Sequence, residues 1–160
     1  MLIHWIWFAT RTGMGDKTKS VLLSHFEDPE EIYFAPELEF ERFEDLSPSA
    51  VESIMDKDLT ACEEILESCQ EKGIHILTYR DAAYPVRLKN IPDPPMVLYY
   101  RGNLPDCDAS PLIGVVGTRK ASAYGLGVAK RMGYQIAKCG GTVVSGVASG
   151  IDSAAMQAAL

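Results

Sequence analysis

The sequence lacks the features of a membrane-spanning, exported or metal-binding protein. No apolar run approaches the ~20 residues that a membrane span needs. The apolar amino terminus, residues 1–9, follows no basic segment and precedes no small-x-small cleavage site. The four cysteines form no CxxC pair and have no histidine neighbour at zinc spacing. We therefore expect free thiols, no metal, no membrane association, a cytoplasmic location, and a buried helix over residues 1–9.

Standard motifs for nucleotide binding and nucleophilic catalysis are also missing. The sequence contains neither the GxGxxG fingerprint nor the GxxxxGK[ST] P-loop. Ser145 is not the serine of a GxSxG elbow, because Val143 rather than glycine lies two residues before it. The three histidines lie outside the glycine-rich part of the chain. With no catalytic group of residues in view, we expect a binding protein rather than an enzyme.

The net charge of −7 argues against a nucleic-acid partner until it is divided by position. Residues 1–72 carry 6 basic and 17 acidic side chains, whereas residues 73–160 carry 9 basic and 5 acidic ones. Within residues 111–160, Asp152 is the only acid beside five basic residues. Binding of a polyanion is therefore expected only in the second half.

The first half has the pattern of short helices. Asp16, Pro29 and the pair Ser47-Pro48 are start signals, and a further helix is expected over residues 58–72, before Gly73. We therefore expect an acidic helical domain over residues 1–72. Its Gly-Met-Gly turn at residues 13–15 resembles a helix-hairpin-helix turn, but the acidic surroundings favour a plain packing domain.

The second half changes to an α/β pattern. Strands are expected over residues 74–79, 96–100, 112–116 and 142–144, and helices over residues 123–139 and 151–160. The run at 112–116 is continuously apolar, as in a strand buried on both faces. Strand–helix–strand–helix of this length predicts a βαβ unit with parallel pairing, in a second domain over residues 73–160.

Two glycine-bearing loops, residues 114–125 and 145–152, are expected at the carboxyl ends of parallel strands, where ligands bind in open α/β sheets. Glycines let the backbone approach a phosphate, and the helix amino termini that follow favour an anion. Arg119 adds a fork of donors, whereas Asp152 is expected to order the loops. The alternative is that the glycines only permit tight turns. The candidate DNA- or phosphate-binding residues are Gly117, Thr118, Arg119, Lys120, Ser122, Tyr124, Gly125, Ser145, Gly146, Ala148, Gly150 and Asp152.

Four motifs in fixed order carry a resemblance to a known family. They are Tyr84-Pro85-x-x-Leu88-x-x-Ile91-Pro92-Asp93-Pro94-Pro95-x-x-Leu98-Tyr99, Arg101-Gly102-Asn103, Gly117-Thr118-Arg119-x-x-Ser122-x-Tyr124-Gly125, and Ser145-Gly146-x-Ala148-x-Gly150-Ile151-Asp152. Together with the acidic helical first half, they resemble the DprA/Smf family of DNA-processing proteins over nearly the whole chain.

The resemblance implies an α/β fold: a helical SAM-like or helix-hairpin-helix domain, then a truncated Rossmann-like parallel sheet without a nucleotide cofactor. It implies binding of single-stranded DNA in a positive pocket and loading of a RecA-type recombinase during natural transformation. Arg119 would be the principal phosphate ligand, and the loop from Ser145 to Asp152 would form the facing wall.

The chain departs from the family pattern at Thr118, where serine is common, and at Met156, where histidine is usual. Family members also continue beyond residue 160, with strands that supply further basic residues and surfaces for homodimerisation and recombinase contact. Two other readings stay open: a Rossmann-like nucleotide-phosphate hydrolase of the lysine-decarboxylase-like class, and a protein-interaction module acting through the acidic domain.

Overall fold

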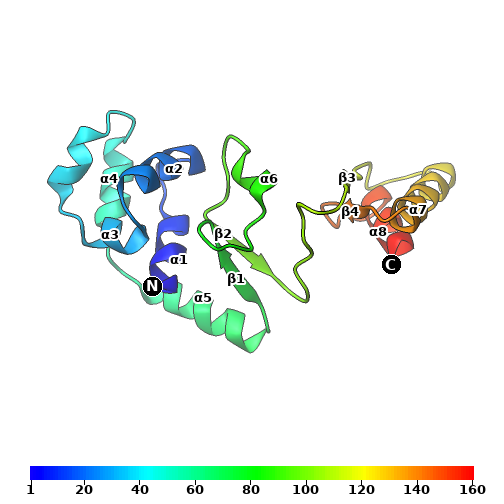
Figure 1. Cartoon of the computed structure of the whole chain (residues 1–160), viewed down its shortest axis with the longest axis horizontal. Coiled ribbons are helices and arrows are strands. Elements are labelled where there is room, and N and C mark those ends of the chain that lie inside the picture. Colours follow the sequence, from blue (N-terminus) through cyan, green and yellow to red (C-terminus); the bar gives the residue numbers. More distant parts are fainter. The chain divides into compact units, whose positions relative to one another are not determined.

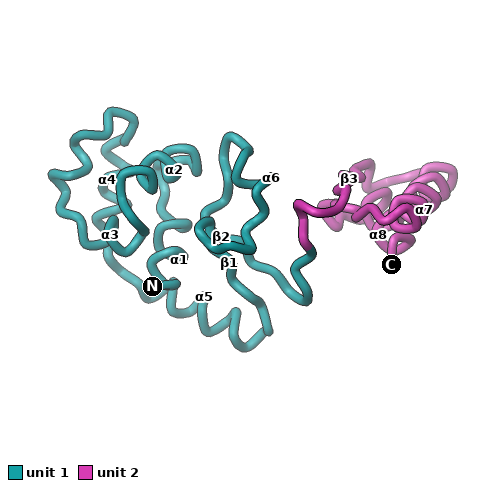
Figure 2. The backbone as a smooth tube through the Cα atoms, viewed as in Figure 1, with its two compact units in different colours: residues 1–105 teal, residues 106–160 magenta.

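The computed structural model describes every residue from 1 to 160 and divides the chain into two compact units. Unit 1 comprises residues 1–105 and unit 2 comprises residues 106–160 (Figure 2). This division falls later than the expected boundary between residues 72 and 73, because the first two strands pack with the helices of unit 1.

Unit 1 is mainly helical, as the sequence predicted (Figure 1). Asp28 accepts hydrogen bonds from the amides of Glu30 and Glu31 before a proline-started helix, and Ser47 caps another through the amide of Ala50. Its elements are α1 (Leu2–Thr10), α2 (Asp16–His25), α3 (Pro29–Phe34), the 3-10 helix η1 (Glu37–Arg42), α4 (Pro48–Met55) and α5 (Thr60–Glu71).

The expected burial of the apolar amino terminus is confirmed. Residues 4–8 of α1 are all buried, and the side chains of Trp7 and Phe8 are 0% exposed. The helix packs against α3, α5 and one strand of the unit. The helix therefore lies at the centre of the unit 1 core. Its burial there accounts for the apolar character of residues 1–9.

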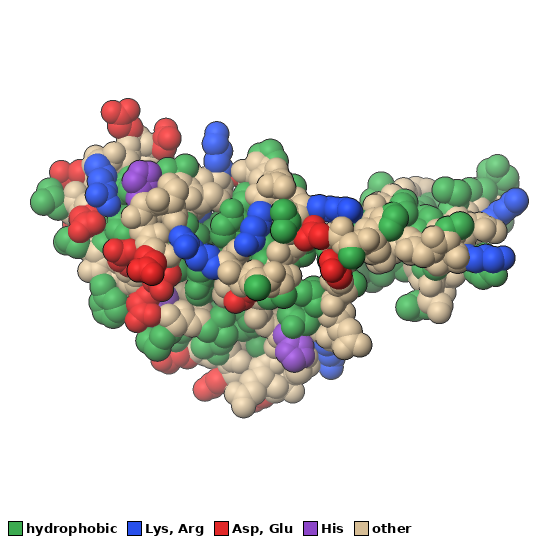
Figure 3. All heavy atoms as spheres, in the orientation of Figure 1, with side chains coloured by type: hydrophobic (Ala, Val, Ile, Leu, Met, Phe, Trp, Pro, Cys, Tyr) green, Lys and Arg blue, Asp and Glu red, His purple; other side chains and the backbone are tan.

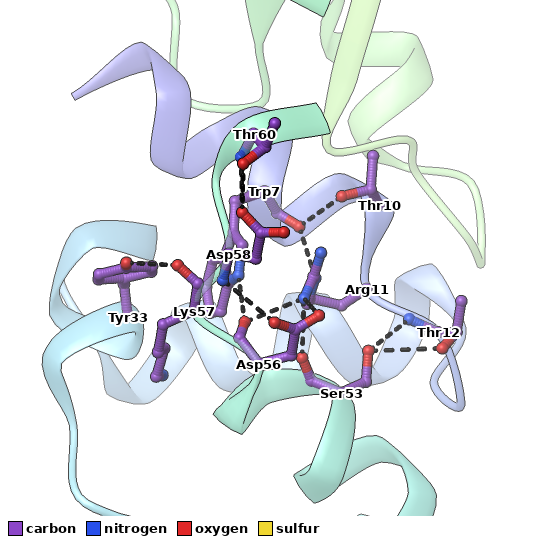
Figure 4. Close-up of polar contacts among 10 residues, drawn as sticks. All are labelled: Trp7, Thr10, Arg11, Thr12, Tyr33, Ser53, Asp56, Lys57, Asp58 and Thr60. Atoms are coloured by element: carbon purple, nitrogen blue, oxygen red, sulfur yellow. Dashed lines mark hydrogen bonds and ion pairs between the residues drawn. The ribbon is translucent and has the colours of Figure 1, made fainter. Parts of the chain in front are cut away.

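Arg11, just after α1, ties that helix to the end of α4 (Figure 4). Its guanidinium donates to the carbonyls of Trp7, Ser53 and Asp56 at 3.0–3.1 Å, and it pairs with the Asp56 carboxylate at 3.3 Å. Next to it, the Lys57 ammonium lies over the rings of Trp7 and Tyr33 at 5.0 and 5.1 Å. That ammonium is buried and makes no hydrogen bond.

Two short strands complete unit 1 and correct the expected parallel pairing. β1 (His75–Thr78) and β2 (Val97–Tyr100) pair antiparallel, with His75 opposite Tyr100, and form a sheet of their own. The segment between them contains a turn of helix, α6 (Val86–Lys89), that the sequence analysis did not predict. Within it, the Tyr84 hydroxyl donates to the carbonyl of Pro95 at 2.7 Å. An antiparallel pair needs only such a local connection.

The Gly-Met-Gly turn of residues 13–15 is closed by groups of unit 1 itself. The amide of Lys17, in the first turn of α2, donates to the Asp93 carboxylate at 3.0 Å. Gly13 has a φ of +77°, and a Cβ there would lie 2.8 Å from the amide nitrogen of Ala50. These contacts support the packing role that the acidic surroundings favoured.

Unit 2 contains the predicted parallel βαβ unit. It consists of β3 (Leu112–Gly114), α7 (Ala123–Lys138), β4 (Thr142–Val144) and α8 (Ile151–Ala159), and Leu112 pairs with Thr142. Its core is small and lies between the helices, with Ala129 of α7 against Ala154 and Ala155 of α8. A Cβ added to Gly133 would lie 2.1 Å from the carbonyl oxygen of Ala155, so these helices approach backbone to backbone.

The expectation of a strand buried on both faces is wrong for residues 112–116. Leu112 and Ile113 are only half-buried, and Val116 is 79% exposed. A sheet of two three-residue strands is too small to be covered on both faces, and α7 and α8 pack chiefly on each other.

Of all the helices in the chain, none has the length and apolar character to cross a membrane.

Candidate functional site

The two glycine-bearing loops follow neighbouring parallel strands and lie together in unit 2. The amide of Val115 donates to the carbonyl of Val144 at 2.9 Å, which continues the β3–β4 ladder to the start of both loops. The Ser145 hydroxyl then donates to the carbonyl of Val115 at 2.7 Å. The two loops therefore begin at the same edge of the sheet, at the carboxyl ends of β3 and β4, as expected for parallel strands.

Asp152 joins the two loops through its carboxylate. Its side chain is buried, and one oxygen accepts a hydrogen bond from the amide of Gly117 at 3.0 Å. The pKa of Asp152 is lowered by the neighbouring Ser145 hydroxyl and by the amides of Gly117 and Gly146, although burial acts in the opposite direction. The loop-ordering role that the sequence suggested for this residue agrees with this geometry.

Glycine is required where the two loops touch. A Cβ on Gly117 would lie 2.6 Å from the side chain of Ile151. Gly150 has a φ of +92°, and a Cβ there would lie 2.3 Å from the carbonyl oxygen of Thr118. That same carbonyl accepts the amide of Ile151 at 3.3 Å. Ile151 was not among the predicted site residues, yet its amide and side chain hold the loops together. Its place between Gly150 and Asp152 was the signal that could have identified it.

The hydroxyls of the first loop have local roles as acceptors. Ser122 caps α7 by accepting the amide of Gly125 at 3.1 Å, and Thr118 accepts the amide of Lys120 at 3.1 Å. In each case the hydroxyl proton remains available to a ligand. In the second loop, the half-buried Ala148 has a backbone role, since its carbonyl accepts the amide of Ser153.

Arg119 and Lys120 carry the positive charge of the loops. Both are exposed, and neither side chain makes a hydrogen bond or ion pair within the chain. Tyr124 follows in the first turn of α7 with 82% of its surface exposed. The other basic residues of unit 2 lie farther along α7, and Lys138 is ~22 Å from its first residue at 1.5 Å per residue. The local charge is therefore two cations and the amino-terminal ends of two helices.

The structure thus brings Gly117, Thr118, Gly125, Ser145, Gly146, Gly150 and Asp152 into one loop assembly and leaves the side chains of Arg119, Lys120 and Tyr124 facing solvent. Nowhere in the chain do three or more histidine, cysteine or acidic side chains gather as they would to hold a metal ion. Among the four cysteines, which are all free, Cys62 and Cys69 are buried.

Known proteins are similar to this chain in sequence and fold. Residues 75–160 match the family model of DNA recombination-mediator protein A. Protein Smf of Synechocystis sp. is 32% identical over 98% of this chain and 40% of its own length. DNA processing protein DprA of Bacillus subtilis is 32% identical over 78% of this chain and 42% of its own. The chain therefore spans about two fifths of the length of these relatives.

A solved structure has the same fold. The X-ray structure of DNA processing protein A (DprA) from Streptococcus pneumoniae superposes with a TM-score of 0.73 over 98% of this chain and 53% of that chain, at 24% identity. The family model itself covers just over half of the residues. The chain therefore belongs to the DprA/Smf family of DNA recombination-mediator proteins.

Proposed function

We propose that this chain binds single-stranded DNA on the loop assembly of unit 2, with Arg119 as the principal phosphate ligand. The observation that carries the proposal is that both loops are fixed to each other by backbone contacts while Arg119 and Lys120 stay unpaired at their surface. A phosphate there would meet charged donors and helix amino termini without displacing an internal partner. Belonging to the recombination-mediator family supports a role in DNA processing beside a RecA-type recombinase.

Single strands suit this surface better than duplex. Tyr124 exposes its ring in the first turn of α7, four residues after Lys120 in the sequence, so a base could stack on it while a neighbouring phosphate meets Arg119. Bases in a duplex are already stacked on each other and are closed to such a ring. We therefore expect oligothymidylate to compete more strongly than a duplex of equal length.

The salt dependence of binding tests which cations touch the phosphates. Each phosphate neutralised on a single strand contributes about −0.7 to the slope of log K against log salt, so two cations give about −1.4. Arg119→Ala should reduce the slope to about −0.7 and weaken binding equally for different base sequences. The matched control is Lys138→Ala, which removes the same charge at the far end of α7 and should leave the slope unchanged.

The measurement is fluorescence anisotropy of labelled oligothymidylate with the whole chain, after circular dichroism shows that each variant is folded. Equal losses for the two variants would mean that only the overall charge matters. An unchanged affinity for Arg119→Ala at low salt would refute the assignment of the site.

A nucleotide-hydrolase function has less support. The buried carboxylate of Asp152 is already committed to the loop amides, and the remaining acids of unit 2, Asp106 and Asp108, precede β3. Asp106 accepts the amides of Asp108 and Ala109, as in a local turn. We therefore expect a nucleoside monophosphate to compete with oligothymidylate only weakly.

A further inference from the structure

Unit 1 has an open groove between η1 and α4, far along the chain from the loops of unit 2. Its volume is about 750 Å³. Apolar side chains form much of its lining: Phe40, Phe43, Leu46, Val51 and Met55. Phe40 is buried, and the others are half-buried, so they present apolar surface to whatever enters the groove.

The same groove is lined by five acidic residues and by no basic one. They are Glu37, Glu41, Glu44, Glu52 and Asp56. Asp56 is partly neutralised by Arg11 at 3.3 Å, but none of the four glutamates forms an ion pair within the chain. In the space-filling view, many of the acidic side chains gather over the part of unit 1 that carries η1 and α4 (Figure 3).

We propose that this groove binds a basic amphipathic helix of a partner protein. An amphipathic helix lays one apolar face into a hydrophobic groove and keeps polar residues at its flanks. Here the flanking charges must be positive, because the groove presents four glutamates that form no ion pair within the chain.

Other occupants fit the charges less well. A nucleic acid would bring phosphates toward uncompensated carboxylates, which like charge disfavours. A second copy docking groove to groove would meet the same acidic surface, again with like charges opposed. A cationic helix is the occupant that both the apolar lining and the charge accept.

The proposal can be tested with a synthetic 18-residue peptide of leucine and lysine whose leucines recur at helical spacing of three and four residues. The control peptide has the same composition in scrambled order. Isothermal titration calorimetry with the whole chain should show binding of the first peptide and about tenfold weaker binding of the second, a difference of about 1.4 kcal/mol.

Charge variants locate the binding surface. The triple variant Glu41→Gln, Glu44→Gln, Glu52→Gln should weaken the amphipathic peptide about tenfold, since each exposed charge pair contributes roughly 0.5 kcal/mol. The matched control, Glu63→Gln, Glu64→Gln, Glu67→Gln, removes three exposed charges from α5 of the same unit and should change the affinity less than twofold.

Three results would overturn the proposal. Equal binding of the scrambled peptide would reduce the effect to charge alone. Equal losses for the two triple variants would place the peptide elsewhere. Concentration-dependent self-association that only the groove variant abolishes, measured by sedimentation, would make a second copy the occupant. None of these outcomes bears on the DNA-binding proposal, since the variants lie in unit 1.

Discussion

Gly133 of α7 gives a sharp test of how unit 2 is held together. A Cβ at this position would lie 2.1 Å from the carbonyl oxygen of Ala155, whereas ordinary contact begins at 3.4 Å, so α7 and α8 must separate by roughly 1 Å. Overpacking of this kind lowers the stability by about 1–3 kcal/mol. The higher helix propensity of alanine relative to glycine offsets about 1 kcal/mol of that loss. We expect Gly133→Ala to destabilise unit 2 by about 1 kcal/mol.

The same helix offers a control. A Cβ on Gly127 meets no atom within 4 Å, so Gly127→Ala has the propensity gain without the collision and should stabilise unit 2 by about 0.5–1 kcal/mol. The two variants should then differ by about 1.5–2 kcal/mol, so amide hydrogen exchange resolved by peptide should show the α8 amides exchanging about 13- to 30-fold faster in Gly133→Ala than in Gly127→Ala. Equal exchange in the two variants would refute the close approach of α7 and α8.

Two further predictions concern unit 1. Burial, with some help from the like charge of Arg11, lowers the pKa of Lys57 from 10.5 to about 8, so the folded state disfavours its charged form (Figure 4). The stability of the parent chain relative to Lys57→Met should therefore be lowest below pH 8 and should rise between pH 8 and 10.5; urea midpoints over that range measure it, and a flat difference would contradict the burial. Asp93→Ala removes the acceptor of the Lys17 amide at 3.0 Å and should cost about 1 kcal/mol, by analogy with the loss of a cap, whereas Asp93→Asn should cost less. Tryptophan fluorescence reports this loss, since both tryptophans lie in the unit 1 core, and an unchanged urea midpoint for Asp93→Ala would show that the contact does not hold the turn.

Helix positions could be predicted where a local signal specifies them. Asp28 and Ser47 precede prolines, and each accepts the amides of the helix that follows. The parallel pairing of β3 and β4 could also be predicted, because a helix of this length is the usual crossover connection between parallel strands. A helix cap acts on residues next to it in the sequence, and the pairing of β3 with β4 follows from the length of the connection between them.

The partner of β1 and the later division of the chain could not be predicted in the same way. The strand pairs with β2 across a segment shaped by the Tyr84–Pro95 hydrogen bond, and it packs with α5. Tertiary contacts of this kind decide pairing but leave no periodic pattern in the sequence. The sequence did not predict η1 and α6. Each has too few residues to show a helical period of apolar side chains.

The residues selected for the candidate site lie in two loops that contact each other, but the sequence did not show which of them shape the loops. Gly117 and Gly150 were expected to let the backbone approach a phosphate, and both lie where the two loops meet. Asp152 was expected to order the loops, and its carboxylate links them. Ser122 and Thr118 were selected as hydroxyls for a phosphate, and each also accepts a nearby amide, which leaves its hydroxyl proton available. A sequence pattern marks residues that a loop requires, but it does not separate those that shape the loop from those that would touch a ligand.

The backbone contacts between the loops also bear on how this surface can vary. The junction needs glycine at positions 117 and 150 and the carboxylate of Asp152, but it uses only the main chain of Thr118 and Arg119. Side chains at 118–120 can therefore change with little effect on the fold, so ligand preference and stability are separable properties here. A family built on this junction can exchange serine for threonine, or one charge for another, by single substitutions that leave the loops in place.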